Sequence, residues 1–188
     1  MRCIALLRGI NVGKARRIAM ADLRSLVEGL GHRDVRTLLN SGNVVFDAAR
    51  AASTGQRAVA IQSAIAQTLG VSAQVTVVTA DELAAIVNSN PFADAAAQPS
   101  RFLVAFFAAA QAARKIAALG ERDWAPERLA LGARAAYLWC PGGILDSKLA
   151  TAVMRLAGDA ATTRNWATVR KLHAMASPSG QWAATSLR

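Results

Sequence analysis

The sequence predicts an α+β protein built from two α-β plaits in one compact chain, each with the element order βαββαβ. Short runs rich in β-branched and apolar residues alternate with segments that carry apolar residues at helical spacing. The order strand, helix, strand, strand, helix, strand occurs twice along the chain. With 188 residues, of which 53% are hydrophobic, the chain is long enough to bury a core in each plait.

The first plait is predicted over residues 1–79, and its elements end at the residue types that such positions favour. Gly31 and Gly70 follow the last apolar residues of two helices, where a left-handed cap favours glycine. Ser53 opens a capping box for the second helix, and Gly42 takes the positive φ in a hairpin turn. Strands are expected at 3–7, 35–39, 43–46 and 74–78, and helices at 20–30 and 53–69.

A second plait with a final helix is predicted over residues 101–176. Thr79 opens another capping box, and the helix and loop that follow form a linker at 80–100. Residues 177–188 contain Pro, Gly and Ser and are predicted to be a tail. Strands are expected at 101–108, 128–131, 135–140 and 160–163, and helices around 116–119, at 146–156 and from 166 onward, the last with Trp166, Val169 and Leu172 on one face.

The formal charge of +10 suggests a polyanionic partner. Most of the 22 basic residues are arginine and alanine is abundant, a combination that codon bias alone can produce, so a solvated basic surface is the alternative. The densest basic cluster, Lys14, Arg16 and Arg17, is the candidate nucleic-acid contact. RNA-binding plaits stack bases on aromatic residues of the first and third strands, where only Phe46 is available here, so this mode is disfavoured.

The sequence predicts a cytoplasmic protein without membrane attachment. The longest apolar run, at 102–110, is about half of what a membrane span needs. Arg8 interrupts the amino-terminal apolar run before a signal peptide could form. Cys3 and Cys140 lie in strand-like runs and give neither a disulfide framework nor metal-ligand spacing.

Three motifs occur in order along the chain: LLRGINVG at 6–13, SGNVVF at 41–46 and TTRNWATV at 162–169. Together with YLWCPGG at 137–143, they resemble the bacterial family called domain of unknown function 1697, and the resemblance runs nearly end to end. It implies two ferredoxin-like halves and brings no established reaction, ligand or catalytic residue. The family usually has a second glycine after NVG, and Lys14 stands there, so this loop is less free to wrap an anion with bare backbone.

The first two motifs are predicted to meet, because the first strand ends at the sheet edge where the second strand turns into the third. Their donors would then face one cleft edge without a nearby carboxylate, which favours an anion. Glycine-containing loops can turn N–H groups toward an anion, and the helix that begins near residue 19 adds its positive end. With two residues of the third motif, the candidate ligand-binding residues are Arg8, Gly9, Asn11, Gly13, Lys14, Ser41, Gly42, Asn43, Arg164 and Asn165.

The third motif is predicted to open the last helix at 162–165, where a threonine caps it and Arg164 projects near free N–H groups. Arg164 could join Arg8 if that helix packs against the first plait, which the sequence does not decide. Two structural alternatives stay open. Arg164 pairs with an acidic neighbour while Trp166 fills the core between the halves, or the glycines and asparagines of the first two motifs serve only tight turns.

Other catalytic patterns are not found in the sequence. The stretch 9–14 superficially resembles a phosphate-binding loop of nucleotide hydrolases, but its spacing is one residue short and Ala15 replaces the magnesium-binding hydroxyl. His32 and His173 lie outside any metal-ligand or catalytic pattern. No cofactor and no metal are predicted, and the sequence leaves open whether the protein is an enzyme. The open functions are binding of a small anion (phosphate, nucleotide or phosphometabolite), nucleic-acid binding through residues 14–17, and a structural or interaction role.

Overall fold

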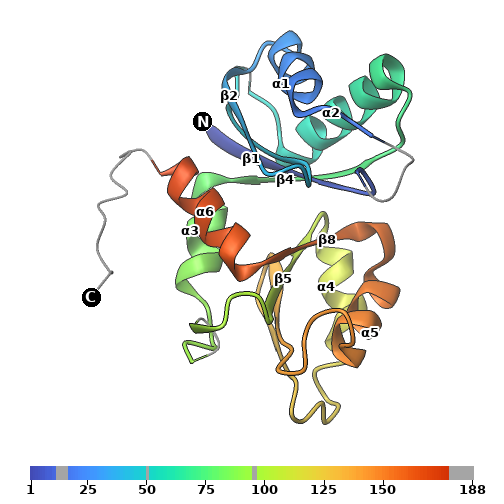
Figure 1. Ribbon diagram of the computed structural model, residues 1–188, viewed down its shortest axis with the longest axis vertical. Helices are drawn as coiled ribbons and strands as arrows, with labels where there is room; N and C mark the ends of the chain where they lie inside the picture. The colour runs from blue at the N-terminus through green and yellow to red at the C-terminus, as the bar shows by residue number, and fades with distance from the viewer. Residues whose placement is uncertain (12–16, 50, 95–96, 178–188) are drawn as a thin grey trace.

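The predicted fold class, α+β with two ferredoxin-like halves, is confirmed by a computed structural model of the chain (Figure 1). The structure describes residues 1–11, 17–49, 51–94 and 97–177. It contains two four-stranded antiparallel sheets, in the strand orders β2-β3-β1-β4 and β6-β7-β5-β8. Among the helices of these ranges, none combines the length and apolar character that a membrane span requires.

The first lobe consists of four strands with two helices on one face of their sheet. Ser53 accepts a hydrogen bond from the N–H of Gln56, and Gly70 ends the second helix at φ +64°, so the predicted capping box and left-handed cap are both present. The elements of this lobe are β1 (Arg2–Arg8), α1 (Met20–Gly29), β2 (Arg33–Leu38), β3 (Asn43–Asp47), α2 (Thr54–Leu69) and β4 (Gln74–Thr79).

The second lobe repeats this order with shorter helices. A single 3-10 turn, Gly158–Ala160, leads into its last strand. The elements of this lobe are β5 (Phe102–Phe107), α4 (Ala110–Ala117), β6 (Arg128–Leu131), β7 (Ala135–Trp139), α5 (Lys148–Ala157) and β8 (Ala161–Asn165).

The strand expected at 160–163 is present as β8, and the last helix begins at Trp166 as expected. The prediction that a threonine at 162–165 caps this helix is wrong, because both threonines lie within the strand. Arg164 lies opposite Val104 and Asn165 opposite Leu103 in the antiparallel pairing with β5. Asn165 is the N-cap of α6 (Trp166–Ala176), and its side chain accepts a hydrogen bond of 2.9 Å from the N–H of Thr168. The pairing with β5 holds the threonines in extended backbone, which β-branched residues favour.

Helices α3 (Ala80–Asn88) and α6 pack between the two lobes (Figure 1). A central hydrophobic core joins residues of both sheets to both helices, and Trp166 lies in it at 4% exposure. The opposite face of the first sheet packs against α1 and α2, and that of the second against α4 and α5. Each sheet is therefore covered on both faces, and one continuous core spans the lobe junction.

Candidate functional site at the lobe junction

The three sequence motifs converge where the first lobe meets the second. The N–H of Leu7 donates to the carbonyl of Gly42 at 2.8 Å, so the first two motifs meet as predicted. Gly42 has φ +72°, and a Cβ at this position would lie 2.6 Å from the Cβ of Leu7. Close backbone contact at the turn therefore requires this glycine.

Arg164 of β8 reaches across the junction into the first lobe. Its guanidinium donates to the carbonyls of Leu7 (2.7 Å), Ser41 (3.1 Å) and Gly42 (3.3 Å), and its Nε donates to Oδ1 of Asn43. These acceptors are neutral oxygens, so the alternative that Arg164 pairs with an acidic neighbour is wrong. Burial lowers the pKa of Arg164 to about 10, which leaves the guanidinium protonated at neutral pH.

Arg8 makes the reciprocal contact from β1 into the second lobe. Its guanidinium donates to the carbonyls of Gly158 and Ala161, the latter at 3.3 Å, and lies 3.8 Å from a carboxylate oxygen of Asp159. The hydroxyls of Thr76 in β4 and Thr162 in β8 also join the lobes, because they lie 3.1 Å apart in a buried hydrogen bond. Each lobe therefore contributes one arginine that binds backbone carbonyls of the other lobe.

The side chains of Asn11 and Asn43 make hydrogen bonds within the first loop and the hairpin turn. Asn11 donates through Nδ2 to the carbonyls of Asn40 (2.7 Å) and Ile18 (3.1 Å), and its Oδ1 accepts the N–H of Ile18 at 2.8 Å. Asn43 donates to the carbonyl of Leu38 and to the hydroxyl of Ser41, both at 2.9 Å. Asn11 therefore fixes the first loop against the hairpin turn.

The expectation that the donors of the first two motifs stand free at one cleft edge is consequently wrong for Arg8, Asn11 and Asn43. The prediction that Arg164 projects near the free N–H groups of the last helix is also wrong, because Arg164 binds carbonyls of the first lobe. The hydrogen bonds of these four side chains are made to protein oxygens, and Asn165 caps α6. Gly9 adopts φ +82° at the end of β1, and Ser41 is exposed at the turn. Gly13, Lys14 and Arg16 lie outside the described residues, whereas Arg17 is described and exposed.

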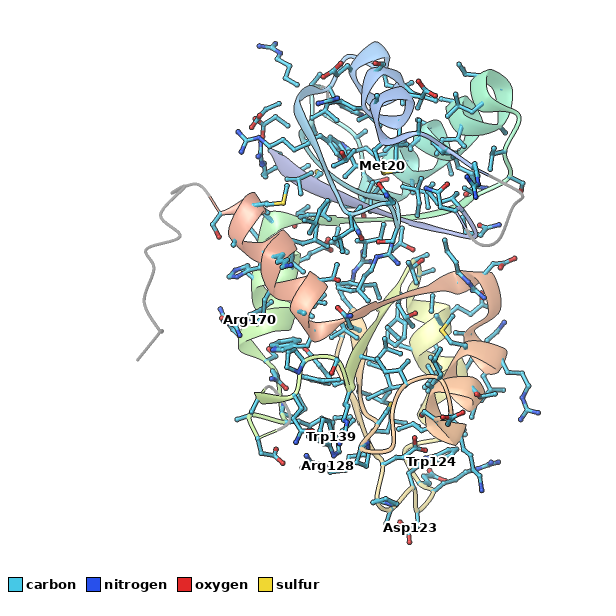
Figure 2. The ribbon with its side chains drawn as sticks, viewed as in Figure 1. Met20, Asp123, Trp124, Arg128, Trp139 and Arg170 are labelled. Atoms are coloured by element: carbon cyan, nitrogen blue, oxygen red, sulfur yellow. The ribbon has the colours of Figure 1, made fainter. Side chains whose placement is uncertain are left out.

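A pocket of about 430 Å³ remains beside these contacts, at the amino-terminal end of α1. We call it the α1 pocket, and Figure 2 labels Met20, which lies on its wall. The described residues that line it are Asn11, Arg17, Ile18, Ala19, Met20 and Asn40. The sequence did not identify Ile18, Ala19, Met20 and Asn40 as wall residues, and it gave Arg17 only as a candidate nucleic-acid contact. The available signal was Ala19 itself, because it precedes the helix where Ser, Thr, Asp or Asn is preferred.

The first turn of α1 leaves backbone donors without a partner inside the helix. Its N-cap, Ala19, offers no side-chain acceptor, and the first intrahelical bond runs from the N–H of Leu23 to the carbonyl of Ala19 at 3.0 Å. The N–H groups of the three residues between them therefore have no acceptor in the helix. The turn carries one carboxylate, Asp22, which is exposed and does not line the pocket.

A second pocket, of about 440 Å³, lies at the opposite end of the molecule and has the opposite charge. Its wall carries the carboxylates of Asp123, Glu127 and Asp146 against the single ammonium of Lys148. Figure 2 shows Asp123 and Trp124 at the end of the second lobe that is remote from the first. Within the described ranges, no group of three or more His, Cys, Asp or Glu side chains could hold a metal ion.

The family model described as "Protein of unknown function (DUF1697)" matches residues 1–137. The chain belongs to this family. The matched range contains the first two motifs and ends before TTRNWATV at 162–169. The search of curated proteins finds no match.

The fold of this DUF1697 protein is shared with a solved structure, described as that of conserved bacterial protein SP0830 from Streptococcus pneumoniae. The two chains superpose with a TM-score of 0.74 at 21% identity, over 94% of this chain and 98% of the other. At this identity the similarity concerns the fold. It shows that the two-lobed arrangement as a whole occurs in a bacterial protein of low sequence identity to this chain.

The sheet surface that RNA-binding plaits use is covered in this DUF1697 protein. The faces of both sheets that turn away from the plait helices lie in the central core against α3 and α6. Phe46 is fully buried on the other face of the first sheet, 4.5 Å from the ring of His32 between centroids. Base stacking on these strands would require the lobes to separate. A nucleic-acid contact through residues 14–17 would therefore involve this loop and not the sheet surface, and it stays a prediction.

Proposed function

We propose that the protein binds a small anionic ligand, such as a phosphate, nucleotide or phosphometabolite, in the α1 pocket. The observation that carries this proposal is a helix amino terminus without a side-chain cap that opens onto a pocket whose described wall holds an arginine and no carboxylate. Free N–H groups and the positive end of the helix dipole both favour an anion at such a position.

Arg17 supplies the positive side chain. It is exposed, and within the described ranges it makes neither an ion pair nor a hydrogen bond. The pocket volume of about 430 Å³ lies within the usual size of small-molecule sites. Asn40 adds a side-chain amide at the wall, which can donate to a phosphate or a carboxylate oxygen.

Two residues with unusual backbone conformations flank the pocket. Asn11 has φ +55° and Leu39 has φ +58°, and leucine rarely adopts this region. Such conformations have a free-energy cost and are common at ligand sites, where the surrounding structure holds them. Their position beside the α1 pocket supports a ligand-binding role for this part of the first lobe.

Arg17→Gln is expected to weaken binding of inorganic phosphate or adenosine monophosphate about tenfold, because a charge-assisted hydrogen bond is lost. The measurement is isothermal titration calorimetry on the full chain at low salt. Arg24→Gln is the matched control, since this substitution removes the same charge and Arg24 is exposed on α1 outside the pocket wall. If neither ligand bound the wild-type protein at millimolar concentration, the proposal would be refuted.

Asp22→Asn is expected to tighten phosphate binding about two- to fivefold, because the carboxylate in the first turn of α1 opposes an anion at the helix end. Glu28→Gln removes an equal charge at the far end of the same helix and is expected to change the dissociation constant much less. Equal effects of the two substitutions would indicate a general charge effect and argue against an anion at the helix end.

We also propose a cytoplasmic location. Its support is that both cysteines are buried free thiols, Cys3 within β1 and Cys140 directly after β7, as suits a reducing compartment.

A further inference from the structure

We propose that Arg164 is a positioning residue for the α1 pocket, through which the second lobe controls anion affinity in the first. This inference rests on the proposed function. Arg164 does not line the pocket, and its effect is transmitted by a chain of hydrogen bonds through the hairpin turn between β2 and β3.

The first link holds the hairpin turn. The guanidinium of Arg164 binds the carbonyls of Ser41 and Gly42, and its Nε binds the side chain of Asn43. The planar fork of an arginine fixes several oxygens in one orientation, which a lysine ammonium does not do. Arg164 also binds the carbonyl of Leu7, so the same guanidinium sets the turn against the end of β1.

The second link joins the turn to the pocket. The carbonyl of Asn40 accepts from Nδ2 of Asn11 at 2.7 Å, and the same amide group binds both the N–H and the carbonyl of Ile18. Asn11, Ile18 and Asn40 are all wall residues. A shift of the turn therefore moves one wall directly and the start of α1 through Asn11.

The turn depends on these outside contacts for its shape. Leu39 and Gly42 both have positive φ, and Leu39 is 53% exposed, so its side chain adds little packing. A turn that holds a leucine in the left-handed region relaxes when its restraints are removed. Without Arg164, the wall formed by Asn40 loses its fixed position.

Two consequences follow for binding. Removing Arg164 weakens anion binding although no ligand contact is lost. By linkage, a bound anion stabilises the turn to which Arg164 binds and so strengthens the junction of the lobes.

The test is calorimetric titration of inorganic phosphate into full-length Arg164→Gln and Arg164→Lys, each first checked for folding by circular dichroism. We expect about tenfold weaker binding for Arg164→Gln and an intermediate value for Arg164→Lys. Arg170→Gln is the control, because Arg170 is exposed on α6, the helix that directly follows β8 (Figure 2). Amide hydrogen exchange of Ile18 without phosphate is expected to accelerate in Arg164→Gln and to stay unchanged in Arg170→Gln.

A double variant tests the path of the coupling. If Asn11 and Arg164 act in one chain, then Asn11→Ala with Arg164→Lys binds phosphate no more weakly than Asn11→Ala alone. Additive losses would show that Arg164 acts by another route and would overturn the proposed chain.

The outcomes separate this inference from the proposed function. If wild-type protein does not bind phosphate, both fail. If it binds, and folded Arg164→Gln binds with the same dissociation constant, the coupling is overturned and the proposed function stands. If Arg164→Gln does not fold, Arg164→Lys decides, and wild-type affinity in that variant overturns the coupling.

Discussion

Trp166→Ala is expected to lower the free energy of unfolding by about 3–5 kcal/mol, because it removes the largest side chain from the core between the lobes. Trp166 is 4% exposed, and its ring stacks on Phe102 with 4.9 Å between centroids. The surrounding core takes residues from both sheets and from α3 and α6, so no single segment can move in to fill the cavity. The measurement is urea denaturation followed by far-UV circular dichroism.

Two control variants define what this loss means. Trp166→Phe keeps an aromatic ring against Phe102 and is expected to retain most of the stability. Trp124→Ala removes a half-buried tryptophan at the edge of the second lobe, and its loss should be smaller. A loss below about 1 kcal/mol for Trp166→Ala would contradict a tightly packed core between the lobes.

Gly42→Ala is expected to lower the free energy of unfolding by about 2–4 kcal/mol, because two costs add at this position. The backbone has φ +72°, which alanine adopts only with strain. The new methyl group would also lie 2.6 Å from the Cβ of Leu7 and 2.7 Å from Cδ1 of Ile10. The end of Ile10 can rotate away, whereas the Cβ of Leu7 is fixed by the β1 backbone.

Two other glycines separate the costs in the same denaturation assay. Gly70 has φ +64° with nothing within 4 Å of an added Cβ, so Gly70→Ala measures strain alone, at about 1 kcal/mol. Gly29 ends α1 with nothing within 4 Å and no positive φ, so Gly29→Ala should be neutral or slightly stabilising. Equal losses for Gly42→Ala and Gly70→Ala would mean that the contact with Leu7 has no measurable cost.

The predicted losses of stability and the predicted changes in anion binding concern neighbouring parts of the lobe junction. The motif residues Arg8, Gly42, Asn43 and Arg164 hold the lobes and the hairpin turn together. The proposed anion site lies just beyond them, where Arg17 and the first turn of α1 face the α1 pocket. The same motif residues can hold the lobes together and also position the hairpin turn that forms part of the pocket wall. The Arg164 variants test whether these two roles are connected.

The fold class and the meeting of the first two motifs could be predicted from the amino-acid sequence, because both follow from local signals. Periodicity marks strands and helices, and capping residues such as Ser53 and Thr79 mark where helices begin. Once the plait order is known, the end of the first strand and the turn after the second must share one sheet edge. The helix cap was wrongly assigned to a threonine, because pairing with the distant strand β5 keeps Thr162 and Thr163 extended and leaves Asn165 to cap the helix.

Which hydrogen-bond donors are engaged, and where a pocket remains open, could not be predicted from the sequence. Arg164 binds the carbonyl of Leu7, 157 residues away in the chain, and the side chain of Asn43, 121 residues away. Most of the acceptors for Arg8 and Arg164 are backbone carbonyls, which every residue carries, so residue identity does not mark them. The α1 pocket depends in turn on where those contacts place the hairpin turn, and packing between distant segments sets this position.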